Sequence, residues 1–269
     1  MRPHAAHSKR PGVGLLMAVS LVAGTAVGVL GAAIGSFLNV VIHRLPAGES
    51  IVSPGSRCPS CRTALAPYDN VPVVSWLVLR GSCRSCGTSI SPRYPLVELL
   101  TAALFAVVAV VNGVDERLAL SLPFVAVLMA VAAIDLDHRI IPNRILAPAA
   151  VYAVAAAAVV APGDLPELLA AGGGAFAFLL VTALVYPAGM GMGDVKLAGV
   201  MGLYLGVAVV PALLVAFVAG SLVGIVMLAR EGAAARKKGI PFGPFLALGG
   251  LVGLLAGAEL IDLYVQNFL

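Results

Sequence analysis

The amino-acid sequence predicts an all-α protein, a polytopic bundle of about eight transmembrane helices. Of its 269 residues, 60% are hydrophobic and only 11% are charged, and the mean hydropathy is +1.02. A soluble domain carries about 25% charged residues, so this chain lacks the polar surface to cover itself in water. The lipid bilayer is therefore its expected solvent. In such a protein a pI of 9.0 reflects membrane topology, because Lys and Arg gather on the cytoplasmic side, and it does not indicate nucleic-acid binding.

Uncharged runs along the chain give eight candidate spans, since a helix needs about 20 apolar residues to cross the hydrocarbon core. The second, fourth and sixth are short, and the sixth and seventh could be one broken helix bent at Pro211. Counts of seven and six spans are therefore alternatives. The candidate spans lie near residues 13–36, 96–112, 118–136, 145–161, 168–187, 195–205, 207–229 and 241–265.

The chain divides into four parts. Residues 1–11 form a polar, basic tail, and residues 12–42 form an uncharged run that we expect to be the first transmembrane helix. A cleaved signal peptide is the alternative for this run, but its apolar core is only about 7–15 residues long. Residues 43–95 form one sizeable loop outside the membrane, and residues 96–269 form a helical membrane domain.

Basic residues predict the orientation. With eight alternating spans, four connections lie on the same face of the membrane. They are the loop 43–95, the turn after the third span, the start of the sixth span and the last connection. These regions hold 13 of the 17 Lys and Arg residues, whereas the opposite face has Arg117 and the tail residues Arg2, Lys9 and Arg10. The positive-inside rule then places the four basic regions in the cytoplasm.

All four cysteines lie in the loop 43–95, in two C-x2-C pairs separated by 21 residues. Two residues between cysteines let a tight turn aim both thiolates at one ion, and two such knuckles complete the tetrahedron that zinc prefers. The expected metal ligands are Cys58, Cys61, Cys83 and Cys86, and neighbouring Arg57, Arg62 and Arg84 would offset their charge. A pair of disulfides and a thioredoxin-like redox site are the alternatives, but a cytoplasmic loop disfavours structural disulfides and no βαβ pattern surrounds either pair.

Three aspartates lie at the cytoplasmic edge of the predicted spans, where ionisable groups are costly and usually functional. Asp135 and Asp137 end the third span, and Asp194 begins the sixth within Gly191-Met-Gly193-Asp194. Two carboxyls that meet in a partly dry site share a proton, so one acts as general base and the other as general acid. Gly191 and Gly193 would supply backbone freedom around one of them.

Helix geometry limits the pairing of these aspartates. Residues two apart on a helix point about 200° apart, so Asp135 and Asp137 cannot both face Asp194. The alternative for each motif is structural: a solvated helix end with ion pairs for Asp135 and Asp137, and a turn with a helix N-cap for Asp194.

In these motifs the sequence resembles the bifunctional prepilin peptidases, also called type IV leader peptidases, over roughly residues 31–244. Five matches occur in the order of that family: Gly35-Ser-Phe-Leu-Asn39 to Pro46; Cys58-Pro-Ser-Cys61 with Asn70-Val-Pro72 and Cys83-Arg-Ser-Cys86; Ser91-Pro-Arg93-Tyr94-Pro95 with Glu98; Asp135 with Pro142-Asn143; and Gly191-Met-Gly193-Asp194-Val-Lys196.

The resemblance implies that Asp135 and Asp194 are the catalytic pair of an aspartic peptidase in the bacterial inner membrane, with its active site facing the cytoplasm. It implies protein substrates that are precursor pilins or pseudopilins, cut after a Gly that ends a short basic leader. It also implies methylation of the new N-terminal amine with S-adenosylmethionine, without identifying the residues that bind this donor.

Two other functions remain as alternatives. One is a peptidase without methyl transfer, in which the zinc loop is purely structural. The other is a small proton-coupled transporter, which would need carboxylates near the bilayer midplane and an internal repeat, and the sequence indicates neither.

Overall fold

The computed structural model describes residues 13–187, 189–232 and 239–268, and the regular elements in these residues are helices. The tail expected at residues 1–11 and three basic residues of the last connection, Arg236, Lys237 and Lys238, lie outside the described residues. In chain order the elements are α1 Val13–Arg44, the 3-10 turn η1 Pro67–Asn70, α2 Val74–Val78, α3 Arg93–Asn112, α4 Leu118–His138, α5 Asn143–Val160, α6 Leu165–Val185, α7 Met192–Leu205, the 3-10 turn η2 Gly206–Ala208, α8 Val209–Glu231 and α9 Gly243–Phe268.

Seven helical stretches in the described residues are long and apolar enough to cross a membrane, and one of them, Met192–Glu231, contains both α7 and α8. The two helices run in opposite directions. A Cβ on Gly253, well inside α9, would meet Ala208 at the start of α8, whereas Gly220 lies against Phe242, next to the start of α9. Helix α8 therefore returns toward the end where α7 begins, so this stretch comprises two antiparallel helices, and the eight long helices of the described residues correspond to the eight predicted spans.

The turn between α7 and α8 lies at Gly206 and not at Pro211, the residue where the sequence placed a possible bend. Gly206 has φ +58, which favours glycine, and the backbone N–H of Val207 donates to Glu167 Oε1 at 3.1 Å. Pro211 lies in the first turn of α8, where the missing N–H of proline breaks no helical hydrogen bond.

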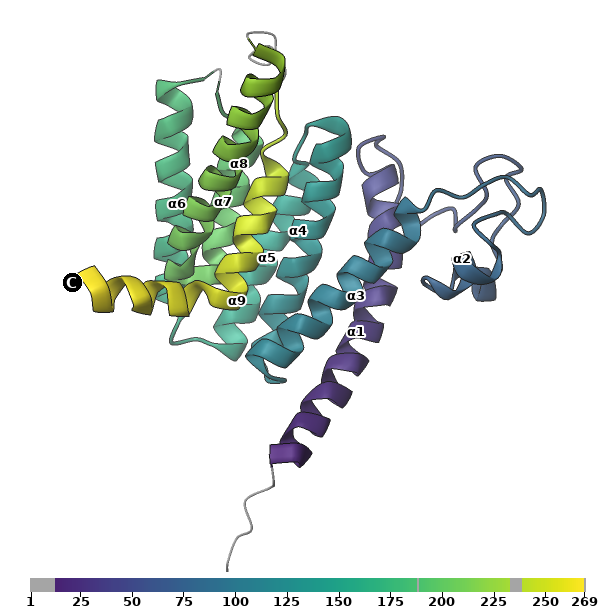
Figure 1. Cartoon of the computed structure of the whole chain (residues 1–269), viewed down its shortest axis with the longest axis horizontal. Helices are drawn as coiled ribbons and strands as arrows, with labels where there is room; N and C mark the ends of the chain where they lie inside the picture. The colour runs from purple at the N-terminus through teal and green to yellow at the C-terminus, as the bar shows by residue number, and fades with distance from the viewer. Residues whose placement is uncertain (1–12, 188, 233–238, 269) are drawn as a thin grey trace, which may run out of the picture.

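Helices α1 and α3 form a closely packed pair beside the bundle of α4–α9 (Figure 1). Gly24, Gly28, Gly31 and Gly35 line the contacting face of α1, and a Cβ at Gly31 would lie 2.8 Å from Phe105 of α3. Such small residues let two membrane helices approach closely. Helix α1 continues eight residues beyond the predicted span, as far as Arg44, because no helix-breaking residue precedes Pro46.

Helix α4 is the centre of the molecule. Its side chains Phe124, Val125, Leu128, Val131 and Ile134 are fully buried, and α4 contacts α1, α3, α5, α7 and α9. Because helices pack around it on every side, the residues at its end are held in fixed surroundings.

The connections before α3, after α4, before α7 and before α9 lie together at one end of the bundle, which we call the aspartate end. Arg93 of α3 forms an ion pair with Asp137 of α4, a Cβ at Gly193 of α7 would meet Ile141 at 2.9 Å, and the first residue of α9 contacts Asp135. The loop between α1 and α3, which carries the cysteines, extends from this same end (Figure 1).

Candidate active site and metal site

Asp135 lies in the last turn of α4, and only 5% of its surface is exposed. Its Oδ2 accepts a hydrogen bond of 2.8 Å from the backbone N–H of Gly243, the first residue of α9. Helix α4 ends at His138 because Arg139 adopts the left-handed conformation, with φ 55, and Pro142 follows. The chain thus places a carboxyl at a helix end inside the packed bundle.

Asp194 is the third residue of α7, and its Oδ2 accepts a hydrogen bond of 3.2 Å from the backbone N–H of Gly191. This contact closes the first turn of the helix. A carboxylate in that position also meets the positive end of the helix dipole. Asp194 therefore stabilises the start of α7 from the third helical position, and not as the N-cap considered as an alternative, because the N-cap is Gly191.

Two contacts hold the segments of the two aspartates side by side. Lys196 Nζ donates to Asn143 Oδ1 at 3.0 Å, and Gly193 packs against Ile141. As a result, the first turn of α7, which carries Asp194, lies beside the end of α4, which carries Asp135. A pair of carboxyls in this arrangement can share one proton and act as acid and base on a water molecule.

Asp135 and Asp137 lie on different sides of α4. Asp135 contacts Gly243 at the start of α9, and Asp137 does not share this contact. Asp137 forms an ion pair with Arg93 of α3, on a different side of α4. Arg93 also donates to the carbonyl of Ala133 at 3.2 Å. Asp137 therefore belongs to the contact between α3 and α4.

The two glycines before Asp194 act differently from the sequence expectation. Neither has a positive φ: Gly191 has φ −78, and Gly193 is not among the residues with left-handed backbone. Instead, each provides room, because a Cβ at Gly191 would lie 3.1 Å from Asp194 Oδ2 and one at Gly193 would lie 2.9 Å from Ile141. Close approach, not backbone freedom, is the physical reason for glycine here.

The four cysteines form one cluster at the expected positions. The Sγ atoms of Cys58, Cys61, Cys83 and Cys86 lie within 4.8 Å of one another, and all four thiols are free. Cys58 Sγ and Cys86 Sγ are 3.7 Å apart. Four Zn–S bonds of about 2.3 Å in a tetrahedron would separate the sulfurs by about 3.8 Å, so the cluster fits a metal ion of that kind.

The two cysteine knuckles repeat one backbone pattern at an interval of 25 residues. Cys58 N–H donates to the carbonyl of Thr63, and Cys83 N–H donates to that of Thr88, at 3.0 and 2.8 Å. The sequence analysis missed these threonines, although the pattern C-x2-C-x-T occurs twice. Their hydroxyls lie 3.3 Å from Sγ of the second cysteine in each pair. Thr88 thereby lowers the pKa of the Cys86 thiol to about 6, which favours the thiolate that binds metals.

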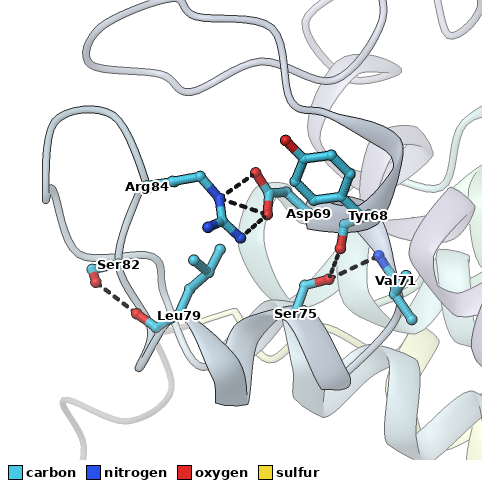
Figure 2. A network of polar contacts seen from close by, with 7 residues as sticks. All are labelled: Tyr68, Asp69, Val71, Ser75, Leu79, Ser82 and Arg84. Carbon is cyan, nitrogen blue, oxygen red and sulfur yellow. Dashed lines mark hydrogen bonds and ion pairs between the residues drawn. The ribbon is translucent and has the colours of Figure 1, made fainter.

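Polar contacts join the segments between the knuckles (Figure 2). Arg84 donates to both carboxylate oxygens of Asp69, with the shortest contact at 2.7 Å, and its guanidinium lies 5.5 Å from the ring centroid of Tyr68. This guanidinium lowers the pKa of the Asp69 carboxyl. Ser75 Oγ accepts from the N–H of Val71 and donates to the carbonyl of Tyr68. Arg84, which the sequence suggested as a counter-charge to the cysteines, therefore pairs with Asp69.

Glu98 connects the cysteine loop to the membrane helices. This buried residue of α3 accepts a hydrogen bond of 2.7 Å from the backbone N–H of Val73. Val73 has φ 62, which is rare for a β-branched residue, so the contact fixes a strained turn at the start of α2. Sequence reasoning matched Glu98 to a family motif but assigned it no role.

Comparison with known proteins gives two consecutive domain matches. Residues 29–112 match the bacterial peptidase A24 N-terminal domain, and residues 122–228 match the type IV leader peptidase family. No solved structure matches the chain significantly.

Several curated relatives, each named prepilin leader peptidase/N-methyltransferase, cover most of the chain. The Bacillus subtilis protein is 37% identical over 88% of this chain and 96% of its own length. The Myxococcus xanthus protein is 41% identical over 85% of this chain and 68% of its own length. The Stutzerimonas stutzeri protein is 36% identical over 88% of this chain and 92% of its own length.

Proposed function

The chain belongs to the type IV leader peptidase family, and we infer from this membership that it is a prepilin leader peptidase and N-methyltransferase of the membrane. The N-terminal domain match and the names of the relatives support both activities on one chain. The two alternatives, a peptidase alone and a proton-coupled transporter, are not favoured, because the matching relatives carry the names of both enzymatic activities.

We propose that Asp135 and Asp194 are the catalytic pair. The observation that carries this proposal is that the segments of these two carboxyls, from the separate helices α4 and α7, lie side by side at one end of the bundle. Carboxyls that cannot both ionise share a proton, which provides one base and one acid at the same pH. Such acid–base assistance accelerates a reaction by a factor of about 10² to 10⁴.

The proposed hydrolysis uses both carboxyls in each half of the reaction. The ionised carboxylate takes a proton from water while the oxygen of that water bonds to the scissile carbonyl carbon. The protonated carboxyl gives its proton to the carbonyl oxygen, so a neutral tetrahedral diol forms. The diol then collapses as the C–N bond breaks; the first carboxyl returns its proton to the leaving nitrogen, and the second takes one from a diol hydroxyl.

We propose zinc as the ion of the cysteine cluster. Four thiolates, a sulfur separation of 3.7 Å and two tight knuckles support a closed tetrahedral site without an open position for substrate. The loop has little apolar core of its own, so zinc would contribute much of its folding free energy. Its role is then structural: it would hold residues 56–90 as a rigid unit beside the membrane.

S-adenosylmethionine, when bound, supplies an electrophilic methyl group for transfer to the new N-terminal amine. A cleft of about 380 Å³ lies between α1 and the cysteine loop, lined by residues that include Ser36, Phe37, Arg44, Ser56 and Asn70. This volume is within the range of about 300–1,000 Å³ for small-molecule sites, which supports the cleft as the donor site. If it is, Ser36→Trp should fill it and stop methylation while cleavage continues; unchanged methylation would exclude the cleft.

We propose that the aspartate end faces the cytoplasm of a bacterial inner membrane, because the connections at that end carry most Lys and Arg residues. A precursor pilin could then keep its apolar helix in lipid while its leader reaches the two aspartates. Two exposed valines at opposite ends test this orientation. A membrane-impermeant thiol reagent should label Val52→Cys from the cytoplasmic side and Val114→Cys from the outside, above the background of the native cysteines. The reverse result would invert the topology.

The purified protein in lipid vesicles, mixed with a precursor pilin and S-adenosylmethionine, tests the proposed function directly. Mass spectrometry of the product should find cleavage after the Gly that ends the leader, and one added methyl group on the new N-terminus. Without the donor the cut should remain and the methyl group should be absent. An intact precursor in both reactions would contradict the proposal.

A further inference from the structure

The first backbone amide of α9 is directed at the carboxyl of Asp135. The N–H of Gly243 donates to Oδ2 of Asp135 at 2.8 Å, although 108 residues separate the two in the sequence. The contact is buried, and only 5% of the surface of Asp135 is exposed. A hydrogen bond in such surroundings restricts the orientation of the whole carboxyl group, because water cannot replace it.

Glycine is required at this position by the shape of the site. A Cβ added to Gly243 would lie 2.8 Å from Oδ2, 3.0 Å from Cβ and 3.1 Å from Cγ of Asp135. Every one of these three nearest atoms belongs to the same aspartate, so any side chain at position 243 would displace the carboxyl. Among the described glycines, Gly191 makes a similar but longer approach to the other aspartate: a Cβ at Gly191 would lie 3.1 Å from Oδ2 of Asp194.

Helix α9 has little freedom to move away from such a clash. Two turns further along, a Cβ at Gly250 would lie 2.8 Å from Leu128 and 3.3 Å from Phe124, both fully buried in α4. On its other side, Gly249 lies against the backbone of Ala212 in α8. Since α9 is packed between α4 and α8, a clash at Gly243 would be relieved mainly by rotation of Asp135.

We propose that Gly243 is a positioning residue for the peptidase reaction: the N-terminal amide of α9 holds Oδ2 of Asp135, so that Oδ1 is the oxygen presented to the attacking water and to Asp194. The proposal rests on the assignment of Asp135 and Asp194 as the catalytic pair. It adds that a third segment, outside the two aspartate motifs, sets the geometry of that pair. The sequence analysis could not indicate this, because the group that acts is a backbone N–H.

Gly243→Ala tests the proposal when it is compared with two matched glycine substitutions. Gly250→Ala also adds a methyl group between α9 and α4, but two turns away from Asp135. Gly224→Ala adds one in α8, where no atom lies within 4 Å of the new Cβ. Each protein is purified in lipid vesicles, and three quantities are measured: kcat and KM for precursor cleavage, the methylation rate of a pre-cleaved pilin, and the melting temperature.

Gly243→Ala should lower kcat for cleavage by about 10- to 100-fold, since a displacement of about 1 Å at a reacting group can cost about 10² in rate. Its KM and the methylation rate should stay at wild-type values. Gly250→Ala should lower the melting temperature at least as much as Gly243→Ala does, but keep kcat within about threefold of wild type. Gly224→Ala should match wild type in all three measurements.

Cleavage by Gly243→Ala at the wild-type kcat would overturn the proposal. It would also be overturned if cleavage and methylation fell together, or if Gly250→Ala lost cleavage equally, because both results indicate general loss of packing. The wild-type reaction separates this failure from a failure of the proposed function: a wild-type protein that cleaves while Gly243→Ala cleaves equally well removes only the role of Gly243.

Discussion

Two aspartates that are neighbours in the sequence serve different parts of the molecule. Side chains two residues apart on α4 point about 200° apart, so Asp135 faces α9 while Asp137 faces Arg93 of α3. Helical geometry predicts that only one of them can reach Asp194, but it cannot say which. That choice depends on which helices surround α4; the resemblance implies Asp135, and the ion pair of Asp137 with α3 is consistent with that assignment.

The Asp137→Asn substitution should retain cleavage. It removes an ion pair with Arg93 in which both side chains are partly exposed, at 43% and 33%, and such a pair contributes about 0.2–1 kcal/mol to stability. We therefore expect kcat within about threefold of wild type and a small fall in the melting temperature. Loss of cleavage comparable with that of Asp135→Asn would show that the pair has been assigned to the wrong aspartate.

Other residues of the site could not be identified from residue types alone. Lys196 and Asn143 belong to matched motifs, yet their contact, which joins α7 to α5, requires the packing of two distant segments. Glu98 was matched to a family motif without a role, whereas the structure shows that its partner is a backbone N–H in the cysteine loop. Side-chain patterns do not encode such backbone partners, so the structure was needed to find them.

Among the elements, the cysteine loop was predicted most fully and the short helices least. The C-x2-C spacing was sufficient to predict one four-thiol cluster. In contrast, no sequence pattern predicted η1 and α2, which lie between the knuckles and are held by Asp69, Arg84 and Ser75. These contacts order a segment in which burial contributes little, because its apolar side chains Val74, Leu77 and Val78 are largely exposed.

The cysteine loop should contain one zinc ion per chain, and its loss should affect methylation before cleavage. The free energy of zinc binding, about 10–16 kcal/mol in isolated zinc modules, would stabilise the fold of the loop. The two aspartates, in contrast, lie on helices that pack together without the zinc site. Metal analysis of the purified protein and both activity assays after treatment with a chelator measure this. Cys86→Ser is the matched variant and should reproduce the chelator result.

Two results would contradict the zinc prediction. The first is purified protein without metal in which the four thiols are paired as disulfides. The second is cleavage that is lost at least as readily as methylation when zinc is removed, because the loop would then support the peptidase site directly.

For the whole molecule, the sequence predicted the long apolar helices and the shared end of the four basic connections, but not the precise limits of the helices. The first predicted span, near 13–36, stopped short of the end of α1 at Arg44, and the second, from residue 96, began after the start of α3 at Arg93. Helices end at breakers and caps, not at the first charge. The turn at Gly206 is stabilised by a hydrogen bond from the Val207 N–H to Glu167 of α6. A sequence pattern cannot predict this contact, because Glu167 lies 40 residues earlier in the chain.

The arrangement of the whole bundle explains how distant segments form one site. Helix α4 is buried at the centre, α7 and α9 pack against it, and all three place one end at the aspartate end. The cysteine loop extends from that same end, beside α1 and α3. A substrate anchored in lipid can therefore reach the two aspartates and the loop from one side of the membrane.

The most direct measurement of the central claim is precursor cleavage by Asp135→Asn and Asp194→Asn, each purified in lipid vesicles beside Asp137→Asn. Asparagine keeps the shape of the side chain but removes its acid–base chemistry, so each of the first two variants should lose cleavage by a factor of about 10² to 10⁴. Both should still methylate a pre-cleaved pilin, which shows that they are folded. Cleavage at a wild-type rate by either Asp135→Asn or Asp194→Asn would contradict the account.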